Sequence, residues 1–211
     1  MTVLNQLACA LNRRDEVPNQ QVALRIVGRR DTKAVRELVD QLAAGTKAVR
    51  SDCIKVLYEI GKREPELIAD YCDEFTALID GKDNRLAWGA MFALDCIAAV
   101  RPKQVYARLD EIVAATEAGS VITRDHAVGI LIKLAANKSY AKRSIDLLLK
   151  IMKEAPGNQI PMYAENAYPA FGAADREAFR KILVRRMERL EKESQKKRVA
   201  KVLHKLETKG A

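Results

Sequence analysis

Residues 86–96, LAWGAMFALDC, carry the only tryptophan of the chain, Trp88, and an aspartate, Asp95, seven residues after it. Residues i and i+7 of an α-helix lie on the same face, so both side chains would project in one direction. An aromatic ring beside a carboxylate is a pairing that an enzyme pocket would use. No histidine, cysteine or second acid falls on the same helix face, so the stretch lacks a base–nucleophile arrangement. We therefore predict no catalytic residue here.

Metal and thiol chemistry also lack their usual spacing. No CxxC pair and no close cluster occurs among the potential zinc ligands, which are Cys9, Cys53, Cys72, Cys96, His126 and His204. We predict no metal site, no cofactor, and free buried thiols of the kind found in a reducing cytosol. The first residues lack the features of a signal peptide, and no segment approaches the ~20 apolar residues of a membrane span. The sequence predicts a soluble, cytoplasmic protein that does not contact membranes.

The composition favours helices. With 211 residues, the chain is long enough for one domain with a sizeable core or for a continuous array of small units. Hydrophobic residues make up 48% and charged residues 31%, as in an ordinary globular protein, and aromatic residues only 5%. Leu, Ala, Lys, Arg and Glu dominate, and these residues favour helix.

The sequence repeats itself at a step of 37 residues. The segments DCIKVLYEIG (52–61), GAMFALDCIA (89–98), HAVGILIKLA (126–135) and YAENAYPAFG (163–172) align at that step, and QVALRIVG (21–28) joins them at a step of 33. Small residues recur at Cys53, Ala90, Ala127 and Ala164, and large ones at Leu57, Leu94, Leu131 and Tyr168. Self-similarity with this period is typical of a solenoid.

Each repeat divides into two helices, A and B. Gly45, Gly81, Gly119 and Gly157 fall where the B helices end and a left-handed residue is favoured. Thr46 and Ser120 are candidate N-caps, and Pro65 and Pro102 fit the first turn of a B helix. The A helices are predicted near 19–29, 46–62, 83–100, 120–136 and 159–172, the last one kinked or ended by Pro169. The B helices are predicted near 32–44, 65–80, 102–118, 139–154 and 174–192, with single capping helices at 2–12 and 194–208.

At AVRSDCIKVLYEIG the chain resembles the HEAT-repeat family, through Val49, Arg50, Leu57, Ile60 and Gly61. The resemblance covers residues 19–192 and implies an all-α fold. We predict a right-handed α-α superhelix, or solenoid, of about five two-helix HEAT-like repeats in a single domain. The N-terminal cap would occupy 1–17, the repeats 18–192 and a basic C-terminal cap 193–211.

The repeat register sets Trp88 and Asp95 away from the core. The apolar stripe of the third A helix consists of Ala90, Ala93, Leu94 and Ile97. At ~100° per residue, Trp88 and Asp95 lie nearly opposite this stripe. Trp88 either covers the seam to an adjacent A helix, with Asp95 solvated, or anchors a partner. Gly89 beside Trp88 indicates that another group comes close there.

Formal charge changes along the predicted B helices. The second (64–80) has six acids and no Lys or Arg, the third (102–118) has net charge −1 and the fourth (138–154) +3. From Asp175 onward, 13 Lys and Arg face 6 acids, so +7 of the total +9 lies in the last 37 residues. B helices line the concave surface of such stacks, where partners bind. We expect this surface to run from acidic to basic.

The sequence predicts a non-enzymatic interaction scaffold that binds a protein or peptide on its concave B-helix face, since two signs of charge orient a partner. The predicted partner-binding residues are Trp88, Asp95, Asp70, Asp73, Glu74, Arg143, Arg185, Arg186, Lys196, Lys197 and Arg198.

The alternative is a nucleic-acid-binding protein that uses the basic C-terminal third. The HEAT-like DNA glycosylases, to which the repeat is also similar, hold a damaged base with aromatic residues and a carboxylate in a basic groove. Here Trp88 falls on an A helix, off the expected groove. A third possibility is a resemblance to the bilin-lyase HEAT proteins of light-harvesting systems, through the same repeat. The basic end is otherwise interpreted as a solvated cap with ion pairs at helical spacing, such as Glu188 with Lys192.

Overall fold

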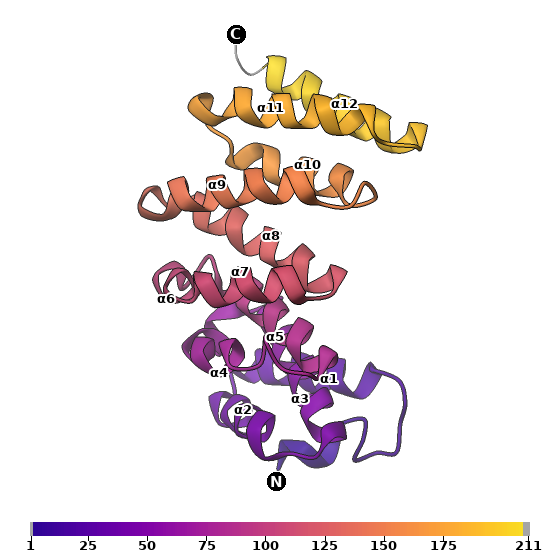
Figure 1. The fold of residues 1–211 in the computed structure, drawn as a ribbon. Helices are drawn as coiled ribbons and strands as arrows, with labels where there is room; N and C mark the ends of the chain where they lie inside the picture. Colours follow the sequence, from indigo (N-terminus) through magenta and orange to yellow (C-terminus); the bar gives the residue numbers. More distant parts are fainter. Residues whose placement is uncertain (1, 209–211) are drawn as a thin grey trace. The chain divides into compact units, whose positions relative to one another are not determined.

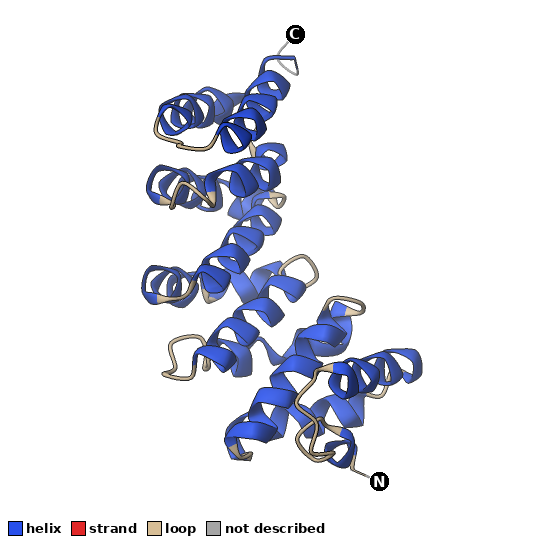
Figure 2. Cartoon of the chain, turned by 90° about the vertical axis from the view of Figure 1, so that its right-hand side faces the viewer, coloured by secondary structure: helices blue, strands red, loops and turns tan. Residues whose placement is uncertain are grey.

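The structure is a computed structural model that describes residues 2–208, apart from the side chain of Ala118. Among these residues every regular element is a helix (Figure 2). The A positions are occupied by α1 (Val17–Arg29), α3 (Lys47–Gly61), α5 (Asn84–Ile97), α8 (Val121–Ala135) and α10 (Ile160–Ala167). The B positions are occupied by α2 (Thr32–Ala44), η2 (Pro65–Tyr71) with α4 (Cys72–Thr76), α6 (Pro102–Ala107) with α7 (Leu109–Ala118), α9 (Lys138–Glu154) and α11 (Ala173–Glu188). The remaining elements are η1 (Val3–Gln6), η3 (Tyr168–Ala170) and α12 (Glu193–Thr208).

The elements form two compact units, one ending at Ile130 and the other beginning at Leu131, within α8. In the first unit α3 lies between α1 and α5, while α2 packs against α3 and α4 against α5 (Figure 1). In the second unit α11 packs against α9 and α12, and α10 packs against α12. The single domain expected from the sequence stays a prediction. Residues 209–211 of the predicted C-terminal cap lie outside the described residues.

The predicted core stripe of the third A helix is confirmed. Ala90, Ala93, Leu94 and Ile97 are fully buried. Thr46 and Ser120 accept hydrogen bonds from the backbone N–H groups three residues later, and Pro65 and Pro102 start their elements. Pro169 ends α10 and leaves one 3-10 turn, η3. No described helix has the length and apolar character needed to cross a bilayer.

The glycines that follow B helices were wrongly predicted to be left-handed, because no described glycine has a positive φ. Gly45 and Gly119 are instead extended, at φ −73° and −86°. A Cβ would lie 2.7 Å from the Gln41 carbonyl oxygen at the first and 2.5 Å from that of Ala115 at the second. Close approach to the last helical turn therefore explains these glycines.

The first repeat is one residue out of its predicted register. Leu24, aligned with core leucines, is 53% exposed, whereas Ala23 and Ile26 are buried. A step of 34 residues, not 33, relates α1 to α3. At this step Asn19 aligns with Cys53 in the repeat, and both side chains are fully buried.

The predicted N-terminal capping helix is wrong beyond the 3-10 turn of η1. The N–H groups of Ala8 and Cys9 donate to the side chains of Asn19 (3.0 Å) and Asp52 (2.7 Å) instead of to helix carbonyls. Asn19 also donates to Asp52 (2.8 Å). Side-chain acceptors on α1 and α3 thus compete with helix formation and fasten the segment to the first unit.

The second and third B helices, predicted as continuous, are each broken in two. The second is a 3-10 segment followed by the five residues of α4. In the third, Arg108 at φ −103°, ψ 15° separates α6 from α7. At the C-terminal side α11 ends at Glu188, so Lys192 is not on the same helix and the helical ion pair predicted for these two residues is absent.

Candidate functional site

Trp88 lies on the seam between two A helices. Its ring centre is 5.7 Å from that of Tyr58 on α3, and the guanidinium of Arg85, ion-paired with Glu16, lies 5.0 Å from the Trp88 ring centre. A Cβ on the adjacent Gly89 would lie 2.8 Å from Cγ1 of Ile54, so the close approach predicted there is confirmed. Trp88 thus contacts the adjacent A helix, and partner binding by Trp88 stays a prediction.

Asp95 is not solvated, contrary to expectation. Its Oδ2 lies 2.9 Å from Nδ1 of His126 on α8, and its side chain is 15% exposed. A Cβ on Gly129 would lie 2.5 Å from Oδ1 of Asp95, so the carboxylate packs flat against α8. No histidine lies near Asp95 on its own helix, but His126 of the next A helix contacts it.

Three stacked rings, one from each of α3, α5 and α8, continue the contact between the A helices. Phe92 of α5 lies 4.8 Å from the Tyr58 ring and 4.0 Å from the His126 ring, with interplanar angles of 16° and 20°. Such offset stacks stabilise packed helices beyond their buried area. Among the described residues, no group of three or more His, Cys, Asp or Glu side chains could hold a metal ion. The Asp95–His126 pair thus joins α5 to α8.

A groove of about 660 Å³ lies on the B elements of the first unit. Its floor consists of the buried residues Thr76, Ile79, Ala87, Ala115 and Thr123. Its rim consists of the more exposed residues Asp73, Ala77, Asp80, Gly81, Asn84, Arg108, Glu111, Ala114, Gly119 and Ser120. The groove therefore runs between α4, with the turn after it, and α7, and the starts of α5 and α8 complete its lining.

The rim of the groove is acidic. Arg108 donates from Nε to Asp73 at 3.0 Å and from Nη1 to Glu111 at 3.4 Å. The hydrogen bond that Arg108 donates to Asp73 raises the pKa of Arg108. Asp80 adds a third carboxylate, so three acids face one base around a floor of small and apolar side chains.

The arginine of the valine–arginine motif has a structural role that recurs along the chain. Arg50 of α3 donates from Nε to the Leu42 carbonyl of α2 at 2.7 Å. Arg124 of α8 donates from Nε to the Thr116 carbonyl of α7 at 3.2 Å. In both repeats an arginine in helix A thus caps the preceding B helix, eight residues after the carbonyl that it binds.

Replacing Arg50 with alanine is expected to lower the free energy of unfolding by about 1–2 kcal/mol, because the Leu42 carbonyl loses a charged donor. Urea unfolding followed by circular dichroism measures this. Lys47→Ala, in the first turn of the same helix and exposed, is the matched control. Equal losses in both variants would contradict the capping role.

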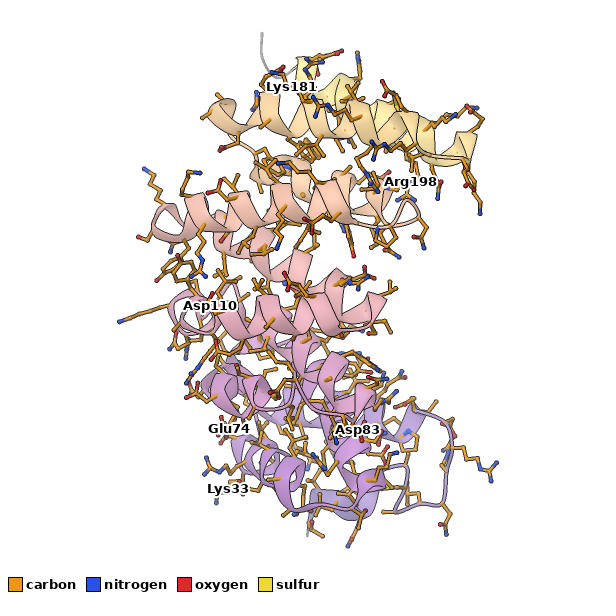
Figure 3. The ribbon with its side chains drawn as sticks, viewed as in Figure 1. Lys33, Glu74, Asp83, Asp110, Lys181 and Arg198 are labelled. Carbon is orange, nitrogen blue, oxygen red and sulfur yellow. The ribbon has the colours of Figure 1, made fainter. Side chains whose placement is uncertain are left out.

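The acids predicted from the second B helix lie on its exposed side. Asp70 and Asp73 pair with Arg101 (3.1 Å) and Arg108 (3.0 Å) of the next repeat. Glu74, labelled in Figure 3, is an exposed residue of α4. Only Asp73 of these three lines the groove.

The basic residues predicted from the second unit are partly engaged within it. Arg186 donates to the backbone carbonyls of Lys153 (3.2 Å) and Ala155 at the end of α9, and burial lowers its pKa. Arg198, labelled in Figure 3, holds both carboxylate oxygens of Glu165, at 2.8 and 2.5 Å. Arg143 on α9, Arg185 on α11 and Lys197 on α12 are exposed, as is Arg198, while Lys196 pairs with Glu193 at 2.9 Å. Partner binding by this group stays a prediction.

The sequence alone does not single out most of the groove residues, among them Arg108, Asp80, Glu111 and Ala87. The spacing of the repeat could have identified Ala87 from the sequence. Arg50, Ala87 and Arg124 are spaced by 37 residues, so the middle repeat lacks the arginine of its neighbours.

No family model and no curated protein matches the sequence. Solved structures do match. A designed armadillo repeat protein in complex with peptide (KR)4 has a TM-score of 0.68 and 16% identity, over 96% of this chain and 97% of that one. A computationally designed armadillo repeat protein for modular peptide recognition has a TM-score of 0.63 and 17% identity, over 96% and 97%. An archaeal HEAT-like repeats protein from Thermococcus onnurineus NA1 has a TM-score of 0.51 and 13% identity, over 92% and 97%. With identities this low, the likeness concerns the fold, and the chain is an all-α solenoid of the HEAT and armadillo-like kind.

Proposed function

We propose that the protein is a non-enzymatic binding scaffold whose B elements hold an extended, positively charged segment of a protein partner. The single observation that carries this is the groove between α4 and α7, with three carboxylates on its rim and one arginine. Opposite charge on the partner steers its approach and fixes its orientation.

The shape of the groove supports a peptide over a folded surface. Its floor and rim contain Ala77, Ala87, Ala114, Ala115, Gly81 and Gly119, which leave room for a peptide backbone to lie close. The volume of about 660 Å³ lies in the range of ligand pockets, which are mostly apolar with a few placed polar groups.

The structural neighbours support the same class of partner. One of them is solved with peptide (KR)4 and another was designed for peptide recognition. A basic peptide suits the acidic rim of this groove, whereas nucleic acid would meet like charge at Asp73, Asp80 and Glu111.

Fluorescence anisotropy of labelled peptide (KR)4 with the full chain tests the proposal. We expect binding at low salt that weakens as salt is raised. The double variant Asp80→Asn, Glu111→Gln is expected to weaken binding about fivefold to tenfold, because two rim charges are lost.

The matched control removes the same charge outside the groove, with Glu74→Gln and Asp110→Asn on α4 and α7. We expect it to change affinity less than about twofold. Equal weakening by both double variants would refute the groove as the site. Binding of a labelled single-stranded oligonucleotide, lost when Arg185 and Lys197 are replaced, would favour the basic second unit instead.

A further inference from the structure

The groove lies at the repeat that lacks the capping arginine. In the second and fourth repeats, Arg50 and Arg124 bind the carbonyls of Leu42 and Thr116. At the same register of the third repeat, Ala87 stands in place of the arginine, and the corresponding carbonyl belongs to Ile79. Both Ala87 and Ile79 line the groove floor.

The surroundings of Ala87 are those of a slot for a long side chain. Ala87 is 8% exposed, Ile79 4%, Ala115 6% and Thr123 2%, so the slot is walled by buried, mostly apolar groups. Among the described residues, none donates a hydrogen bond to the Ile79 carbonyl oxygen. An alkyl chain can pack on these walls while its charged end meets the carbonyl and the acidic rim.

We infer that this slot receives an arginine side chain of the partner, which substitutes for the arginine missing from the third repeat. The inference rests on the proposed function. The partner's guanidinium caps the turn after α4, as Arg50 caps α2 and Arg124 caps α7. Asp80 and Glu111 stand at the rim through which it enters.

The same chemistry separates arginine from lysine. A guanidinium presents several N–H donors in a plane, so it can serve a carbonyl and a carboxylate together, whereas an ammonium is a compact and strongly hydrated charge. In both intact repeats the capping donor is Nε, an atom that lysine lacks. The slot should therefore prefer arginine.

Octa-arginine and octa-lysine, each labelled, test the inference by anisotropy against the full chain. Wild type is expected to bind octa-arginine about fivefold more tightly. In Ala87→Arg the protein supplies its own capping side chain. The preference should disappear, and the affinity for octa-arginine should fall to that for octa-lysine, while the thermal midpoint should rise.

Ala87→Met fills the slot with a shorter, uncharged side chain and serves as a second variant should the arginine variant fold poorly. It is also expected to abolish the preference for arginine. Two results would overturn the slot and leave the proposed function standing. One is a preference for arginine that persists in the folded variants. The other is no preference in wild type while binding still depends on Asp80 and Glu111. Binding of neither peptide by wild type would instead refute the proposed function.

Discussion

Replacing Glu59 with glutamine is expected to lower the free energy of unfolding by about 3 kcal/mol at neutral pH. Glu59 lies on α3 with its side chain 5% exposed, and it accepts from Arg63 at 2.6 Å, from Lys55 at 3.1 Å and from Lys62 at 3.4 Å. The Lys55 side chain is itself only 11% exposed. Removal of the carboxylate therefore leaves a buried ammonium without the charged partner that the structure gives it on Glu59, which is costly.

The same cluster makes stability depend on acid pH. Burial alone would raise the pKa of Glu59, but hydrogen bonds from Arg63 and Lys55 outweigh it and lower the pKa from 4.5 to about 2. The unfolded chain therefore binds a proton first as pH falls. The stabilisation is complete above about pH 4.5 and is lost as pH falls through about 2.

Urea unfolding of wild type and Glu59→Gln, followed by circular dichroism from pH 7 down to pH 2, measures this contribution. The gap between the two proteins should narrow between pH 4.5 and 2. Glu177→Gln, at an exposed carboxylate paired with Arg180 and Lys181, is the control and is expected to change stability little. A constant gap across the pH range would show that the charge of Glu59 is not the cause.

Alanine at Gly61 and at Gly28 should change stability in opposite directions. A Cβ on Gly61, which is buried at the end of α3, would lie 2.6 Å from Cδ1 of Ile68 and 2.9 Å from Cβ of Cys96. Ile68 belongs to η2 and Cys96 to α5, so three elements meet at this glycine. Overpacking is expected to cost about 2 kcal/mol. Gly28 is exposed within α1 with nothing within 4 Å, and alanine there should stabilise by about 0.5–1 kcal/mol.

Chemical denaturation of the two single variants decides this prediction. Both residues close the repeat unit in the sequence pattern, so a pattern alone would treat them alike. If both substitutions change stability in the same direction, the packing of α3 between η2 and α5 is not as described.

The helices and their core faces could be predicted because each repeat carries its own caps and apolar stripe. Thr46 caps its helix, Pro65 begins its element and Leu94 is buried in the core. Each of these roles follows from the position of the residue along a single helix. The exceptions arise where side chains from another repeat intervene. Asn19 and Asp52 take the N–H groups of residues 8 and 9, and no local pattern announces that.

The candidate site was harder to predict for the same reason. Asp95 contacts His126, which is 31 residues away in the sequence, and Arg108 pairs with Asp73, which is 35 residues away. Charge counts along single B helices could not reveal these pairings, because they depend on which residues face each other between repeats. The repeat marks Ala87 as the position where the arginine is missing, but the role of that arginine follows only from the hydrogen bonds of Arg50 and Arg124.

Hydrogen–deuterium exchange of the full chain, with and without saturating peptide (KR)4, tests the central claim most directly. The groove lies within residues 73–123. We expect peptide-dependent protection in residues 72–84 and 108–124, and little change in residues 173–208. Protection confined to 173–208, or spread along the A helices around Trp88 and His126, would contradict the account.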